Sequence, residues 1–148
     1  MSRVEFHAEF AQQFEALAMG DSDVFSDVAA LILALETHGR LVEGFDHTAD
    51  PSHPIVTSSC DMWALRRTPP TAFAPGAEAP PVLRIPYVWM IDKLTQHEYA
   101  LVFFIGDKTI AGNSWYPAAI AKIEGSLLPM WEKEHPGHEA RKRQRGPA

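Results

Sequence analysis

The sequence lacks the features that mark several large classes of protein. Its one cysteine, Cys60, excludes an internal disulfide and a zinc site built from several thiolates. No apolar run approaches the roughly 20 residues that cross a bilayer, and the N-terminus, MSRVEFHAEF, lacks the apolar segment of a secretory signal. We therefore expect a cytoplasmic protein without a membrane segment.

Charge is unevenly distributed along the 148 residues, which suffice for one domain with a single core. The net charge of −6 argues at first against nucleic-acid binding, which normally uses a basic face. However, residues 1–59 hold 10 acidic and 2 basic side chains, whereas residues 60–122 hold 5 acidic and 6 basic ones. A final basic run, Arg141–Arg145, indicates a solvated tail, with polyanion binding as the alternative.

The first 40 residues predict a short strand and two helices. Residues 3–6 suit a strand, and residues 8–19 place apolar side chains at helical spacing up to Gly20. Residues 24–37 carry a second apolar stripe, preceded by acidic and serine residues that can cap a helix. Helices joined by so short a turn should pack as an antiparallel hairpin.

Three strands in succession follow a loop over residues 41–59. The strand candidates are residues 61–67, 82–91 and 99–105, which are rich in β-branched and aromatic side chains. Residues 68–81 contain five prolines and a glycine, so they should form a long excursion at a hairpin tip.

The order of elements indicates an α+β fold, because the strands follow one another and the helices are segregated. A last helix is predicted over residues 115–134. We expect an antiparallel sheet of about four strands covered by the N-terminal helical hairpin, in the order β-α-α-β-β-β-α. Residues 1–135 would form one domain and residues 136–148 a basic tail.

Residues 101–116, LVFFIGDKTIAGNSWY, form the first candidate for chemistry. An apolar strand there ends in Asp107 and Lys108, where it should reach the surface. A glycine-containing turn and the start of the last helix, at Trp115 and Tyr116, come next. Any reaction is therefore expected near this corner.

Four segments together resemble, in order and spacing, the RelE/ParE superfamily of type II toxin-antitoxin toxins, in particular its HigB-like branch. They are LETHGRL, MWALRR, LRIPYVW and FFIGDKTIAGNSWYPAAIAKIEGSLLPMWEKEH. The resemblance implies a RelE-like fold and a toxin that cleaves messenger RNA, commonly on the ribosome. It also implies a cognate antitoxin, of helix-turn-helix type, as partner. No cofactor is implied.

The resemblance and the chemistry of RNA cleavage give roles to the candidate catalytic residues. Attack by a ribose 2′-hydroxyl without a metal needs groups that orient the phosphate, stabilise its charge and move two protons. Arg66 and Arg84 would bind phosphate oxygens. Lys108 would add a third cation, and Tyr116 would move a proton or bind the ribose.

Two further residues would bind the substrate: Arg67, and Trp115 by stacking on a base. Each candidate has a structural alternative. The arginines could pair with acidic neighbours, Lys108 could be a solvated turn residue, and Trp115 could pack in the core.

The histidines carry weaker predictions. His47, His53 and His97 are expected on the surface, with a metal role for the first two or a general-base role for His97 as alternatives. Two other functions remain open at this point. One is a ParE-like poison of DNA gyrase, and the other is a non-catalytic module whose acidic helical hairpin binds a basic partner.

Overall fold

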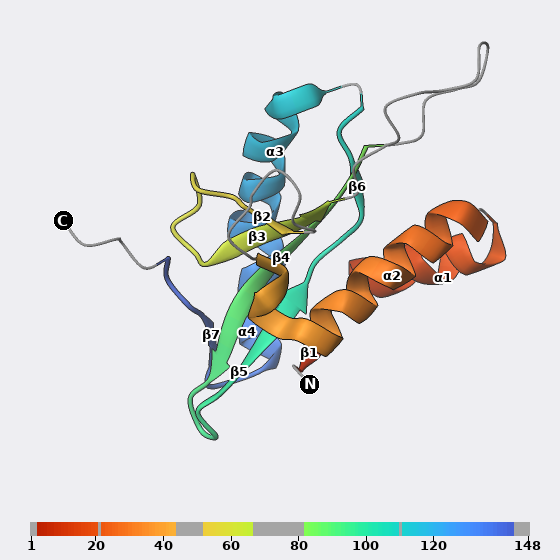
Figure 1. Cartoon of the computed structure of the whole chain (residues 1–148). Helices are drawn as coiled ribbons and strands as arrows, with labels where there is room; N and C mark the ends of the chain where they lie inside the picture. The colour runs from red at the N-terminus through yellow and green to blue at the C-terminus, as the bar shows by residue number, and fades with distance from the viewer. Residues whose placement is uncertain (1–2, 21, 44–51, 67–81, 110, 144–148) are drawn as a thin grey trace, which may run out of the picture.

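A mixed β-sheet forms the centre of the computed structural model, which describes residues 3–20, 22–43, 52–66, 82–109 and 111–143 (Figure 1). From one edge to the other its main strands are β1 (Val4–Phe6), β5 (His97–Val102), β4 (Leu83–Asp92), β3 (Met62–Arg66) and β2 (Ser52–Pro54). Strand β1 runs parallel to β5, and the other pairs are antiparallel.

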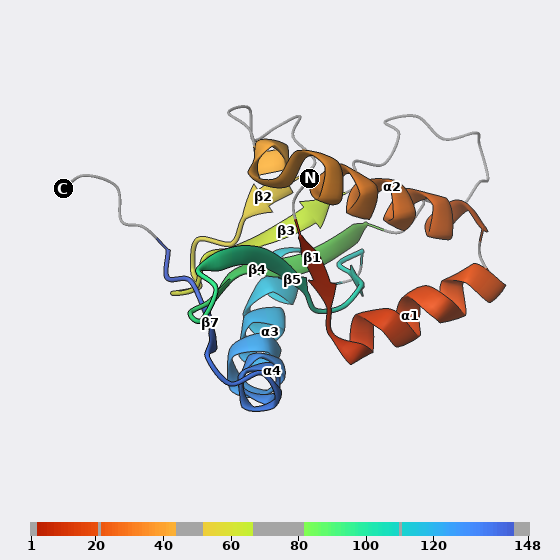
Figure 2. The same ribbon diagram turned by 90° about the horizontal axis from the view of Figure 1, so that it is seen from below.

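The ten-residue strand β4 holds the sheet together. Beside β3 and β5, it also pairs with β6 (Gly106–Asp107) at its beginning and with β7 (His138–Ala140) at its end. Its side chains alternate between two buried faces: Ile85, Tyr87 and Trp89 join one core, and Val88 and Met90 join the other. The sheet is therefore covered on both sides, as Figure 2 shows.

The first layer is the helical hairpin of α1 (Ala8–Met19) and α2 (Ser22–His38), followed by the 3-10 helix η1 (Gly39–Glu43). Both helices were predicted from their apolar stripes and are confirmed. The Gln13 side chain ties α1 to the sheet, because it donates to the Ile105 carbonyl (3.0 Å) and accepts from the Ile105 amide (2.7 Å).

The second layer is the C-terminal helix, which consists of α3 (Trp115–Lys122), a π-helical turn (Ile123–Leu127) and α4 (Leu128–Glu134). The helix predicted over residues 115–134 is confirmed. Pro129 has no N–H to donate, and the π-turn precedes it, so the helix continues through a residue that would disrupt a regular α-helix.

The sheet differs from the expectation in strand number and pairing. An antiparallel sheet of about four strands was expected, whereas the described residues form a mixed seven-stranded sheet. The extra strands β2, β6 and β7 have two or three residues each, too few to show a period in the sequence. The parallel pairing of β1 with β5 joins segments nearly one hundred residues apart along the chain, which local patterns do not reveal.

The expected basic tail contributes to the sheet. Residues 138–140 form β7, and Lys142 bridges to Cys60 beside the start of β3. Arg67 and the proline-rich segment 68–81 lie outside the described residues. Within the described part, no helix combines the length and apolar character that crossing a membrane requires.

Candidate functional site

The strand register places two of the predicted arginines next to each other. Arg66 of β3 and Arg84 of β4 are direct partners in the antiparallel pair, and Gly106 of β6 pairs with Arg84 on its other side. Side chains directly opposite each other project from the same face of a sheet. That face is the one covered by the C-terminal helix, because Met62 and Ala64 of β3 belong to its core.

Helix α3 brings Tyr116 onto this arginine pair. Arg84 donates from Nε to the Tyr116 hydroxyl oxygen at 3.1 Å and from Nη1 to the Leu83 carbonyl at 2.8 Å. Both side chains are half-buried. Among the described residues, the two hydrogen bonds of this guanidinium are both made to neutral acceptors.

Lys108 lies against the ring of the same tyrosine, Tyr116. Its Nζ is 5.2 Å from the centroid of the Tyr116 ring and donates to Asn113 Oδ1 at 3.2 Å. Its backbone amide donates to the Val82 carbonyl, which fixes this segment beside the start of β4. The structure therefore brings Arg66, Arg84, Lys108 and Tyr116 together at one end of the sheet.

The nearby carboxylate of Asp107 is hydrogen-bonded within the turn that follows β6. Burial opposes the ionisation of Asp107, but hydrogen bonds from the hydroxyl and amide of Thr109 outweigh this effect and lower the pKa of the carboxyl. Thr109 Oγ1 also accepts from the Val82 amide at 3.0 Å. Asp107 is thus engaged in the turn that holds Lys108 in place.

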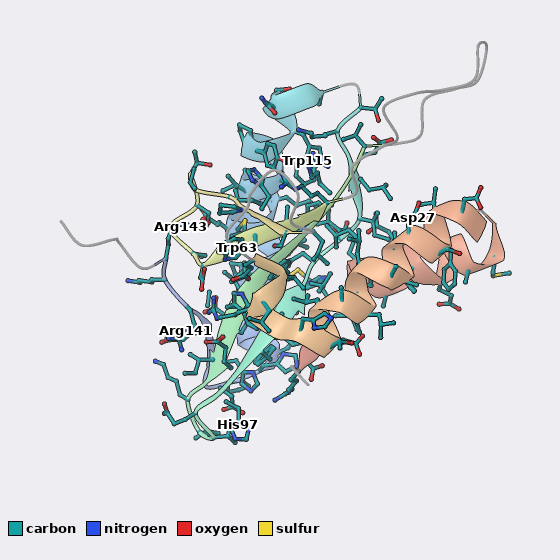
Figure 3. The ribbon with its side chains drawn as sticks, viewed as in Figure 1. Asp27, Trp63, His97, Trp115, Arg141 and Arg143 are labelled. Atoms are coloured by element: carbon teal, nitrogen blue, oxygen red, sulfur yellow. The ribbon has the colours of Figure 1, made fainter. Side chains whose placement is uncertain are left out.

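Trp115 packs against the sheet beside this site (Figure 3). A Cβ atom added to Gly106 would lie 2.3 Å from Cζ2 of the indole, so the ring rests directly on the glycine backbone. The ring also contacts Phe104, with 6.2 Å between centroids. This geometry favours the packing alternative for Trp115 over base stacking, and the packing fixes the start of α3 and with it Tyr116.

The structure adds His53, which sequence reasoning placed on the surface. His53 lies in β2 opposite Ala64, on the same face as Arg66, and its ring is edge-on to Tyr116 with 6.1 Å between centroids. It is half-buried. A three-residue strand that follows one proline and ends in another gives no periodic signal, so only the residue type could have drawn attention to His53.

A buried polar cluster on the opposite face positions β2. Glu43 accepts from the Tyr87 hydroxyl at 2.9 Å and from Trp89 Nε1 at 2.5 Å, and Ser52 Oγ lies 2.6 Å from the Tyr87 hydroxyl. Burial raises the pKa of Glu43 although these donors and Arg40 act in the other direction. Because Ser52 precedes His53, this cluster also fixes the histidine.

The arrangement suits the binding of a phosphodiester. Arg84, Lys108 and His53 each contact Tyr116, and Arg66 lies opposite Arg84 on the same face of the sheet. Among the described residues no group of histidine, cysteine and carboxylate side chains could hold a metal ion. Comparisons with protein-family models, curated proteins and solved structures found no match to this chain.

Proposed function

We propose that this chain is a toxin of the RelE-like, HigB-like type that cleaves messenger RNA without a metal ion and is neutralised by a cognate antitoxin. The observation that carries the proposal is that Arg84 and Lys108 both contact Tyr116, while Arg66 lies opposite Arg84 on the neighbouring strand. The α+β fold, with a hairpin of helices before the antiparallel run β3-β4-β5, supports a RelE-like scaffold.

In this proposal the cations bind the phosphate and stabilise its extra negative charge as the reaction proceeds. The 2′-oxygen forms a bond to phosphorus while the bond from phosphorus to the 5′-oxygen breaks. His53 accepts the proton of the 2′-hydroxyl, and Tyr116 or Lys108 gives a proton to the departing 5′-oxygen. The products are a 2′,3′-cyclic phosphate and a 5′-hydroxyl end.

The antitoxin should cover the basic end of the sheet with acidic or apolar side chains, added as a helix or a strand. The product of an adjacent small gene is expected to co-purify with the chain and to protect Lys108 from chemical modification. A chain that is freely expressed without a partner would contradict this part of the proposal.

Expression of the chain alone tests the proposed activity. We expect growth arrest with cut transcripts for the wild type and neither effect for Arg84→Ala. Lys93→Ala is the matched control, since it removes an exposed cation that pairs with Glu139, beyond the other end of β4.

Growth arrest with intact transcripts, DNA-damage signalling and tolerance of Lys108→Ala would instead indicate a gyrase poison. An absence of toxicity together with a stable protein complex would indicate a non-catalytic module.

A further inference from the structure

The helical hairpin extends beyond the edge of the sheet, next to strand β1 (Figures 1 and 2). Its sequence is unusual in charge. Residues 4–39 contain seven acidic side chains and neither lysine nor arginine. Glu5 and Glu9 pair with Arg3 and Lys122 from outside this range, and the other acidic side chains leave the hairpin with an excess of negative charge, opposite in sign to the candidate cleavage site.

An apolar hollow of about 330 Å³ opens between β1, α1 and α2. The residues that line it are Phe6, Phe10, Ala11, Phe14, Glu15 and Ile32. The Phe6 ring, 37% exposed, stacks on Phe10 with 5.1 Å between centroids, and Phe10 contacts Phe14 at 5.6 Å. The hollow thus has an aromatic wall and a carboxylate at its rim.

A second apolar hollow, of about 400 Å³, lies on the other flank of α1. Its lining is Gln13, Ala16, Leu17, Val24, Leu83 and Ile105. The hairpin also exposes apolar side chains outside the hollows, among them Met19, which is 87% exposed, and Leu33, which is 62% exposed. Exposed apolar surface that gathers on one part of a molecule often marks an interaction site.

We propose that the hollow lined by Phe6, Phe10 and Phe14 binds a basic amphipathic helix of a partner protein. Apolar side chains of that helix, spaced three or four residues apart, enter the hollow, as in other helix-in-groove complexes. Its lysines and arginines face Glu15 and the other carboxylates of the hairpin.

The negative charge of the hairpin favours a basic partner helix over two other possible occupants of the hollow. A second copy of the chain would bring two acidic hairpins together, which is unfavourable. The chain's own basic residues Arg141, Lys142 and Arg143 are held beside Cys60 and β4, on the side of β4 away from β5 and β1. The partner also differs from the antitoxin segment expected over the cleavage site, because that segment must be acidic or apolar.

A labelled 14-residue helical peptide of leucine and lysine, with the leucines on one face, tests the proposal by fluorescence anisotropy at physiological salt. We expect saturable binding, and weakening by about tenfold or more in Ala11→Arg, which fills the hollow and adds a positive charge. Gln12→Arg is the matched control, since it adds the same charge to the same helix at an exposed position outside the hollow. It should weaken binding by less than about twofold.

Glu15→Arg gives a second variant should Ala11→Arg fail to fold, and thermal denaturation establishes which variants are folded. Equal binding by Ala11→Arg and Gln12→Arg, or equal binding of a leucine and glutamate peptide, would overturn the proposal. A dimer of the wild type that Ala11→Arg dissociates would also overturn it, because a second copy would then occupy the hollow. Cleavage of RNA should be unchanged in all three variants, so this test is separate from that of the proposed function.

Discussion

The cationic side chains at the two ends of strand β4 are held in different ways. At the end of β4, Arg40 contacts the carboxylates of Glu43, Asp61 and Glu98 at 3.4, 2.8 and 2.7 Å, and Arg141 contacts Glu98 at 3.2 Å. At its beginning, the partners seen for Arg84 and Lys108 are neutral oxygen atoms. Figure 3 shows where the two ends lie, with Trp115 near one end and Arg141 and His97 toward the other.

The contrast separates structural cations from candidate functional ones. Partial burial opposes the charge on Arg40, but the hydrogen bonds that Arg40 donates to the carboxylates of Glu98 and Asp61 outweigh this effect and raise the pKa of the guanidinium. Arg40 also stacks on Trp89, 4.5 Å from the ring centroid, so it links η1 to the sheet. Arg84 is positioned by two hydrogen bonds, and within the described residues both of their acceptors are neutral.

The largest expected effect is on catalysis. Replacing Arg84 with alanine should lower the rate of RNA cleavage by about 10² to 10³ while the protein stays folded, because one preorganised charge on the phosphate is lost. Arg40→Ala should do the reverse, lowering the midpoint of thermal unfolding and leaving cleavage close to wild type. Cleavage rates and unfolding curves of both variants check the comparison. Equal loss of activity in both would show that the two ends do not differ in function.

His53 is expected to have the next largest effect. His53→Gln should reduce cleavage by about 10² or more, the usual contribution of a general base. It should also remove the fall in rate on the acidic side of the pH profile. His97→Gln is the control, because His97 lies in β5 at the opposite end of β4. A pH profile that keeps its acidic limb in His53→Gln would exclude the proposed role.

Gly106→Ala should act on both structure and activity. The added Cβ would meet the Trp115 ring at 2.3 Å, so the start of α3 must shift, at a cost of about 1–3 kcal/mol in the free energy of unfolding. Cleavage should fall because Tyr116 moves with the helix. In Gly125→Ala the new methyl meets nothing within 4 Å, so stability and activity should be nearly unchanged. Urea titrations of the two variants measure the difference.

The smallest expected effect is that of Glu43 on how the free energy of unfolding depends on pH. Because the folded-state pKa of Glu43 is raised, this group stabilises the protein most at low pH, and the contribution is lost as the pH rises through the raised pKa. The free energy of unfolding of the wild type relative to Glu43→Gln should therefore fall over the pH range above the ordinary pKa of a glutamate side chain, about 4.3. Urea unfolding of both proteins across this range tests the sign, with the exposed Glu139→Gln as control. A difference that grows with pH would contradict it.

The elements with strong periodic patterns could be predicted from the sequence. Helices α1 and α2 and strands β3 and β4 are long enough for burial to impose a readable spacing of apolar residues. Since β3 and β4 were expected to pair, the approach of Arg66 and Arg84 followed from the same argument.

The position of His53 and the packing of Trp115 could not be predicted, because they depend on long-range contacts that leave no local pattern in the sequence. His53 reaches the site only because β2 adds to β3, and β2 is held there through Ser52 and the buried Glu43. Trp115 is packed rather than presented to solvent because Gly106 lies beneath it, nine residues earlier in the chain. Such contacts are set by the whole fold and not by spacing in the sequence.

Cleavage of a defined messenger RNA on ribosomes, in the magnesium buffer that keeps the ribosomes assembled, tests the proposed activity most directly. We expect cuts that end in 2′,3′-cyclic phosphate for the wild type and for Arg40→Ala, and no cuts for Arg84→Ala. A 2′-deoxy nucleotide at the cut position should block the reaction, because the attacking hydroxyl is then missing. Equal cleavage by the wild type and Arg84→Ala, or cleavage of the 2′-deoxy substrate, would contradict it.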